Sequence, residues 1–295
     1  MDKDYSFLLQ IQHISESSII FGDGTFYSCP GLFYQLYTLH GQVQQTVFPF
    51  IYGLLPNKTQ QTYNTFFSAI SQLLTDRNIQ LTAHSVLFDF EVAAKNAFRA
   101  VFPAVSVKSC FFHYTQCVWR KTQSCGLATR YRNDDDVKTL VRRAAVLPLV
   151  PVGRVEDVWF NALEDSEDHT PEMTRFKDYI TETWVESHDK ETWNHFENAG
   201  PRTTNHVEGW HSKVNRLCSS AHPNIYSIIK LIKSIQATNE SKIIQLEAGA
   251  RPRRKKAKYQ RIDARLRIRK DRFRNGELDV YAYADAASHL IHLNE

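Results

Sequence analysis

The chain has 295 residues, of which 42% are hydrophobic and 12% aromatic, and its formal net charge is +4. This composition excludes a disordered polar chain, because enough apolar side chains are present to build a large core. No apolar stretch approaches the roughly 20 residues of a membrane-spanning helix, and the first residues do not begin a secretory signal. We therefore expect a soluble, intracellular protein with no membrane partner. An odd number of cysteines in a long chain indicates reduced thiols: Cys29, Cys110, Cys117, Cys125 and Cys218.

The positive charge is concentrated near the C-terminus. Residues 251–274 hold 13 Lys and Arg against 2 Asp, a local charge of +11, so the rest of the chain carries −7 of the total of +4. The densest part is Arg251-Pro252-Arg253-Arg254-Lys255-Lys256. Such a segment suits contacts with DNA phosphates or nuclear import, and a solvated charged tail has the same composition.

The first hundred residues alternate between strand and helix patterns. Pro49 lies inside a β-rich run, which predicts an edge strand or a bulge there. In chain order we predict three strands, a helix, a strand, a helix and a strand, at 18–26, 34–40, 46–53, from Thr59, and at 85–89, 91–101 and 105–107. Hairpin strands followed by crossover-linked strands predict an α/β fold with a mixed sheet.

After Cys110 the strand patterns give way to helical ones as far as about residue 250. Two apolar faces, at 155–163 and 173–184, indicate an all-helical block in the middle of the chain. A long helix follows, with Pro223 predicted as its first residue and Gly249 at its end.

Asp23 lies in Gly22-Asp23-Gly24-Thr25, where flanking glycines leave its carboxylate open to an ion or to a nucleic-acid backbone. Asp-Gly is also a common turn signal, and from these residues alone a turn is favoured.

Asp89 ends the apolar run Val86-Leu87-Phe88 and leads into a helix, a position where α/β folds place functional groups. An aspartate there can equally cap the helix.

Glu208 belongs to the polar stripe of a helix, together with His211, Ser212 and Asn215. Its alternative role is structural: Asn205 would cap the helix and Glu208 would reach back to the free amide. Three carboxylates converging from two strands and a helix could hold two Mg²⁺ ions for phosphoryl transfer.

Taken together, ordered blocks along the chain resemble the Mutator-like (MULE) transposase family from about residue 15 onward. The blocks are Gly22-Asp23-Gly24-Thr25-Phe26, Phe33 to His40, Tyr52 to Thr59, Asp89-Phe90-Glu91, Cys110 to His113, Cys117 to Lys121, Gly126 to Arg132 and Arg202 to His211. The resemblance implies a ribonuclease-H-like mixed sheet interrupted by an all-helical insertion, with a helical basic C-terminal segment. It also implies a DDE triad on Asp23, Asp89 and Glu208 that binds two Mg²⁺ or Mn²⁺ ions, and this outweighs the turn and capping alternatives.

The resemblance further implies a set of domains and partners. We expect the first part of the catalytic domain at 15–125, the helical insertion at 126–200, completing helices at 201–248 and a basic segment at 249–295. The implied partners are transposon ends and target DNA, bound in the nucleus by a homo-oligomeric synaptic complex. Family members usually carry a zinc-binding recognition module before the first aspartate, and we expect it to be missing here.

Several other motifs receive lesser roles. Cys110 and His113 match the Cys-x-x-His element of the family, which we interpret as a packed pair or one that supports the active site, because no second ligand pair completes a zinc site. The histidines around Glu208 are five residues apart, which excludes the zinc-protease motif, and no P-loop is present. Possible DNA contacts, for which exposed surface cations are the alternative, are Arg120, Lys121, Arg253, Arg254, Lys255 and Lys256.

The predicted function is metal-dependent cleavage and strand transfer of DNA phosphodiesters. The alternative is a domesticated or truncated nucleic-acid-binding protein without catalytic activity.

Overall fold

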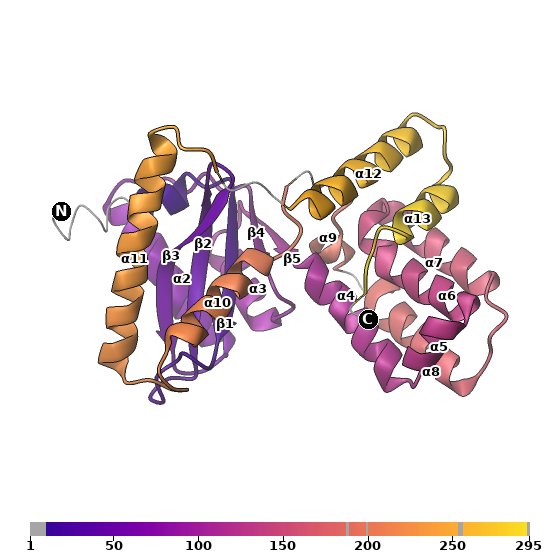
Figure 1. Ribbon diagram of the computed structural model, residues 1–295, viewed down its shortest axis with the longest axis horizontal. Helices are drawn as coiled ribbons and strands as arrows, with labels where there is room; N and C mark the ends of the chain where they lie inside the picture. Colours follow the sequence, from indigo (N-terminus) through magenta and orange to yellow (C-terminus); the bar gives the residue numbers. More distant parts are fainter. Residues whose placement is uncertain (1–9, 187–188, 199, 253–255, 294–295) are drawn as a thin grey trace. The chain divides into compact units, whose positions relative to one another are not determined.

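The computed structural model describes residues 10–186, 189–198, 200–252 and 256–293. The chain divides into two compact units, each made of two segments (Figure 1). The sheet unit comprises residues 1–108 and 203–254, and the helical unit comprises 109–202 and 255–295. The two units are defined by which residues lie close together in space. The boundaries at 15–125, 126–200, 201–248 and 249–295 come from the family resemblance and stay a prediction.

One mixed β-sheet forms the centre of the sheet unit, and its strand order is β3-β2-β1-β4-β5. The first three strands pair antiparallel, and β1 pairs with β4 in parallel. The predicted α/β class with a mixed sheet is confirmed, and the arrangement is compatible with a ribonuclease-H-like fold. The strands are β1 (Ile19–Thr25), β2 (Gln35–Val43), β3 (Thr46–Leu55), β4 (Ser85–Phe88) and β5 (Ser106–Ser109).

Pro49 fits both of its predicted roles. β3 lies at one edge of the sheet, where a missing backbone N–H is tolerated. The register also shifts beside Pro49, because Leu39 pairs with Ile51 whereas His40 pairs with Pro49, so that Phe50 is an extra residue.

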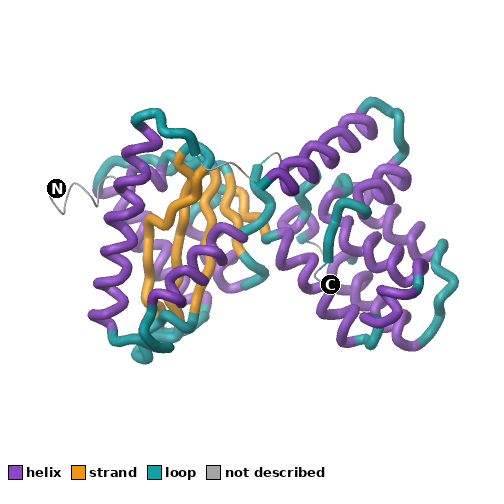
Figure 2. Tube along the Cα trace, viewed as in Figure 1, coloured by secondary structure: helices purple, strands orange, loops and turns teal. Residues whose placement is uncertain are grey.

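Helices cover both faces of the sheet (Figure 2). On one face α2 (Gln60–Asp76) and α3 (Val92–Val101) enclose an aromatic core that includes Phe67, Phe88 and Phe98. On the other, α10 (Asn205–Leu217) packs Val207 against Phe21 and Leu87 of the strands. α11 (Ile225–Glu247) adds Ile228 and Ile235, which pack with Leu36 and Val214.

Two predicted boundaries in this unit were wrong by a few residues. Asn224 caps α11 by accepting a hydrogen bond from the Tyr226 amide, so the helix begins at Ile225 and Pro223 precedes the cap. Asparagine satisfies an orphan amide there, which proline cannot do. The last strand occupies Ser106–Ser109 in place of 105–107.

The helical unit confirms the predicted all-helical block, with no strand among its described residues apart from the end of β5. All five cysteines are free thiols, as predicted. In the described part of the chain, no helix combines the length and apolarity that crossing a membrane requires. The α-helices are α4 (Phe111–Ser124), α5 (Ala128–Asn133), α6 (Asp135–Val146), α7 (Val155–Glu164), α8 (Pro171–Ile180), α9 (Lys190–Trp193), α12 (Ala257–Arg274) and α13 (Val280–Ser288).

Gly22 allows the ring of Phe88 to lie over β1, because a Cβ at this position would overlap that ring. We predict that Gly22→Ala lowers the free energy of unfolding of the sheet unit by about 1–3 kcal/mol, the usual cost of overpacking a core. Amide hydrogen exchange in β1 and β4 measures this. Gly31→Ala is the control, since nothing lies within 4 Å of its added Cβ, and an equal effect of both changes would contradict the packing argument.

Candidate functional site

Asp23 lies inside β1, directly opposite Thr38 of β2, and not in a turn. The turn alternative is therefore wrong, and the flanking glycines have a packing role. Because side chains alternate along a strand, Gly22 and Gly24 lie on the face opposite to Asp23. A Cβ on Gly24 would overlap the buried Gln35 amide, just as one on Gly22 would overlap Phe88. The Asp23 carboxylate accepts a hydrogen bond from the Gly24 amide at 2.8 Å and faces α10.

Asp89 follows the last residue of β4, the strand parallel to β1. Phe21 pairs with Leu87, and continuing this register by two residues places Asp89 beside Asp23. The helix that follows has Glu91 as its N-cap, so the capping role considered for Asp89 is wrong. Instead, the Asp89 Oδ1 accepts a hydrogen bond from the Glu91 amide at 3.0 Å, which fixes the turn into α3.

The pKa of the buried Tyr37 is affected by both aspartates. Burial raises the pKa of Tyr37 well above its ordinary value, and nearby acidic groups add to the rise, in the order Tyr63, Asp89, Asp23 and Glu91. Both aspartates therefore lie near enough to the Tyr37 hydroxyl to disfavour its ionisation.

Glu91 is a third acidic residue at this end of the sheet, and no pattern in the sequence indicated a role for it. Its carboxylate accepts hydrogen bonds from the Tyr63 hydroxyl at 2.6 Å and from the Lys58 ammonium at 2.8 Å. The Gln35 amide in turn donates to the Tyr63 hydroxyl. Tyr63 and Lys58 thereby fix the orientation of the Glu91 carboxylate, while the Glu91 amide donates to Asp89.

Glu208 lies in the first turn of α10, the helix that packs on β1. Thr204 is the N-cap and Asn205 the first helical residue, so the predicted capping role of Asn205 is wrong. Glu208 is half-buried and lies one helical turn before His211, on the same side of the helix.

His211 connects α10 to Asp23. Its Nδ1 lies 3.3 Å from the Asp23 Oδ2, and its Nε2 lies 3.1 Å from the Thr38 hydroxyl. The Thr38 hydroxyl is also 2.9 Å from the Nε2 of His40. Burial lowers the pKa of His40 well below its ordinary value, and His211 and His206 lower it further, so His40 is neutral at pH 7.

One assignment of protons connects this buried row of side chains, and in it only the Nδ1 of His40 has no hydrogen-bond partner within the described residues. His40 donates its Nε2–H to Thr38, Thr38 donates to the Nε2 of His211, and His211 donates its Nδ1–H towards Asp23. The row holds α10 against the strand that carries Asp23. Single residues of this kind give no signal in a sequence, because buried threonines and histidines are usually only packed.

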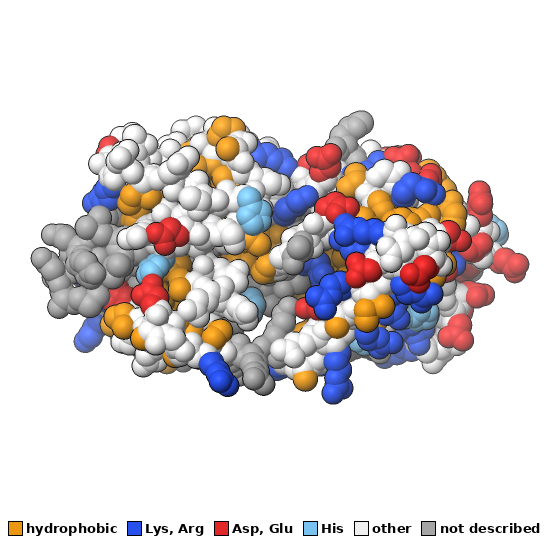
Figure 3. Space-filling model, turned by 90° about the horizontal axis from the view of Figure 1, so that it is seen from above, with side chains coloured by type: hydrophobic (Ala, Val, Ile, Leu, Met, Phe, Trp, Pro, Cys, Tyr) orange, Lys and Arg blue, Asp and Glu red, His pale blue; other side chains and the backbone are white. Residues whose placement is uncertain are grey.

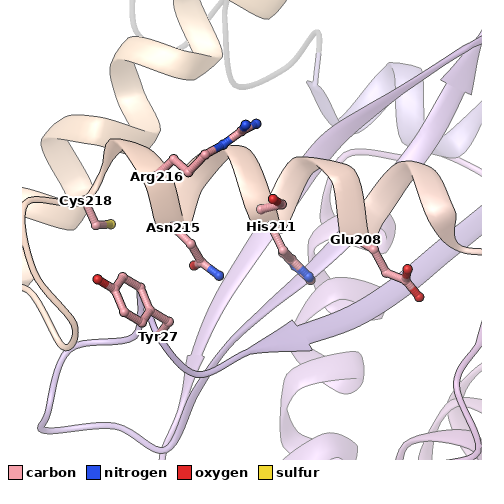
Figure 4. A pocket seen from close by; sticks show the side chains of 7 residues that line it. Tyr27, Glu208, His211, Asn215, Arg216 and Cys218 are labelled. Carbon is pink, nitrogen blue, oxygen red and sulfur yellow. The ribbon is translucent and has the colours of Figure 1, made fainter.

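An open pocket of about 640 Å³ lies beside this row. Figure 4 shows Glu208, His211 and Asn215 in succession along one side of α10, with Tyr27 across from Asn215. Ser212, Arg216 and Cys218 complete the lining. The pocket therefore joins a candidate catalytic carboxylate to polar and aromatic groups.

Residues 19–117 match the family model of the MULE transposase domain. This part of the chain is a MULE transposase domain. The family resemblance found in the sequence is confirmed, and the match includes Asp23 and Asp89, whereas Glu208 lies beyond it. Among curated proteins, no match to the chain was found.

A divalent metal ion is expected in a MULE transposase domain. Within the described residues, no group of three or more His, Cys, Asp or Glu side chains is arranged to hold one. The donor chemistry of Asp23, Asp89 and Glu208 nevertheless fits Mg²⁺ or Mn²⁺, because all three offer hard carboxylate oxygens. All three also come from the β1 and β4 strands or from α10, which packs on them.

The Cys-x-x-His element lies at the start of α4, in the helical unit. Cys110 is buried and precedes the first helical residue, and His113 is half-buried one turn further on. Its supporting role in the MULE transposase domain stays a prediction.

The predicted DNA-contact residues differ in their surroundings. Arg120 is exposed, whereas the Lys121 ammonium lies 4.8 Å from the ring centre of Tyr179, a cation–π contact that occupies it. Lys256 is exposed, and Arg253, Arg254 and Lys255 lie outside the described residues.

We expect the row formed by His40, Thr38, His211 and Asp23 to contribute to the stability of the sheet unit. Thr38→Val keeps the shape of the side chain but leaves two buried imidazole nitrogens without their hydroxyl partner. We expect the free energy of unfolding of the sheet unit to fall by about 1–3 kcal/mol, measured by amide hydrogen exchange in β1 and β2. Thr122→Val is the matched control, because that buried hydroxyl contacts only the carbonyl of Val118 in its own helix among the described hydrogen bonds. Unchanged exchange in Thr38→Val would show that the row contributes nothing.

Proposed function

We propose that this chain is the catalytic core of a Mutator-like DNA transposase, which cuts DNA phosphodiesters and joins the ends to target DNA. The observation that carries the proposal is the pairing of β1 with β4 inside the matched domain. Continued by two residues, the register of this pairing puts Asp89, which directly follows β4, next to Asp23 of β1, and Asp23 contacts the helix that bears Glu208.

Each of these residues has a role in the proposed reaction. Asp23, Asp89 and Glu208 would hold two divalent ions. When bound, such ions activate the attacking water or 3′-hydroxyl and stabilise the leaving 3′-oxygen, so no side-chain nucleophile is needed. His211 would orient the Asp23 carboxylate through its Nδ1. Lys58 would hold Glu91 away from the ions by pairing with it.

DNA is the partner that membership in the family implies, and the basic side chains of α12 support this. Figure 3 shows Lys and Arg side chains interspersed with Asp and Glu over the helical unit. Arg261, Arg265 and Arg267 of α12 are exposed and form none of the ion pairs described for the chain. We propose that α12 contacts DNA phosphates, that the protein works in the nucleus, and that it assembles as a homo-oligomer on transposon ends.

Nicking of DNA by the purified chain tests the catalytic proposal. We expect Mg²⁺- or Mn²⁺-dependent nicking that falls by at least about 100-fold in Asp23→Ala, Asp89→Ala and Glu208→Ala, since bound ions contribute several kcal/mol to the transition state. Asp76→Ala, at the end of α2, is the carboxylate control and should keep full activity. Unchanged nicking in Asp89→Ala would refute the proposed triad. Binding that survives all three changes, with no cleavage by the wild type, would favour the non-catalytic DNA-binding alternative.

The basic segment makes a separate prediction. Replacing Arg261, Arg265 and Arg267 by Gln should weaken DNA binding and lower the salt dependence of log Kd by about 0.9 for each phosphate that the variant no longer neutralises. Arg154→Gln is the control, because Arg154 already pairs with Asp157. A slope equal to that of the wild type would exclude α12 from the interface.

Nuclear import by the basic segment is tested separately. Deleting residues 251–258 from a fluorescent fusion should abolish nuclear accumulation, and a retained nuclear signal would contradict a role of this segment in nuclear import.

A further inference from the structure

The loop between β1 and β2 exposes aromatic side chains close to the candidate carboxylates. Phe26, Tyr27 and Tyr34 are 43%, 45% and 53% exposed. Phe26 and Tyr34 meet edge to face with ring centres 5.5 Å apart, and Lys58 lies 4.9 Å from the centre of the Phe26 ring. Tyr27 differs from both, because it lines the pocket beside α10.

The backbone of Tyr27 is fixed from outside the loop. Its carbonyl accepts a hydrogen bond from the His222 amide at 2.8 Å, and the His222 side chain lies 3.1 Å from the Cys29 carbonyl. The ring is therefore presented to the pocket by an ordered segment, which lowers the entropy that binding must overcome.

The pocket offers a flat apolar surface on one side and polar groups on the other. Tyr27 faces Asn215, whose side-chain oxygen is 3.5 Å from the Thr25 hydroxyl, and the exposed cation Arg216 follows in the helix (Figure 4). A volume of about 640 Å³ lies within the range of small-molecule sites. These three groups suit one nucleotide. An aromatic ring can stack on the base, an amide can form hydrogen bonds with the edge of the base, and a guanidinium can pair with the phosphate of the nucleotide.

We propose that this pocket takes one unpaired nucleobase of the DNA substrate, stacked on Tyr27, next to the phosphodiester that is cut. Asn215 would contact the edge of the base and Arg216 the adjoining phosphate. The inference rests on the proposed function and deepens it, since it assigns the substrate a nucleotide that has left the base stack.

The position of the pocket supports this occupant. Tyr27 follows Asp23 by four residues, so at most about 14 Å of extended chain separates the two, and Glu208 lines the same pocket. Bases inside a duplex are covered by their neighbours and cannot stack on a protein ring. Unstacking a base costs free energy, which stacking on the Tyr27 ring would offset.

Fluorescence of DNA containing 2-aminopurine tests the proposal on the full chain in EDTA, so that no cleavage occurs. One duplex carries a single unpaired 2-aminopurine, and the matched duplex carries the same base paired with thymine. We expect tighter binding of the first duplex, by roughly 5- to 100-fold, with quenching of its fluorescence on stacking. Tyr27→Phe should keep both properties, and Tyr27→Ala should lose both.

Two further variants keep the result interpretable. Tyr226→Ala removes a tyrosine that is 80% exposed and lies outside the pocket lining, and it should bind as the wild type does. Arg216→Gln replaces an exposed side chain and should weaken binding of the duplex that carries the unpaired 2-aminopurine. Equal affinity of the wild type for the two duplexes, absence of binding, or an unchanged preference in Tyr27→Ala would overturn the inference. Nicking assays run in parallel separate the two proposals: cleavage without stacking refutes only the pocket, and stacking without cleavage refutes only the catalytic role.

Discussion

The close pairing of β1 with β4 is the constraint on which the candidate site depends. Backbone hydrogen bonds set the spacing of the two parallel strands, and Gly22 leaves the space on one face of β1 that the ring of Phe88 occupies. The alternation of a strand then directs Asp23 to the opposite face, towards α10. A glycine–aspartate–glycine sequence thus serves packing and chemistry together, with the glycines on the core side and the carboxylate on the helix side.

Polar side chains form hydrogen bonds on both faces of the sheet near the paired strands β1 and β4. On one side, Gln35, Tyr63, Glu91 and Lys58 form a continuous set of hydrogen bonds under Asp89. On the other, His40, Thr38 and His211 connect the middle of the sheet to the helix that bears Glu208. Buried hydrogen bonds of this kind favour one arrangement, because displacing a segment breaks several of them together. They fix Asp23 through Gly24 and His211, and Asp89 through the Glu91 amide.

Much of this architecture could be predicted from the sequence, because strand and helix periods report directly on burial. β1 to β4, α2 and α3 all begin within one residue of their predicted starts, and Pro49 marks both an edge and a bulge. Local patterns misled at Asp23, where Asp-Gly favoured a turn, because a strand that needs glycines for close packing has the same composition as a turn. Pro223 and Asn205 were misplaced because neighbouring residues, Asn224 and Thr204, took the capping positions. Glu91, Thr38 and the row of histidines were missed, since their roles arise only from contacts between distant segments.

We propose that Asp23, inside β1, and Asp89, directly after β4, share a divalent ion. Anomalous X-ray diffraction from crystals soaked in Mn²⁺ tests this directly, because it locates the ion without relying on activity. The account predicts a manganese peak between the carboxylates of Asp23 and Asp89 that disappears in Asp89→Asn. A peak held by other residues, or no peak beside these two carboxylates at saturating Mn²⁺, would contradict it.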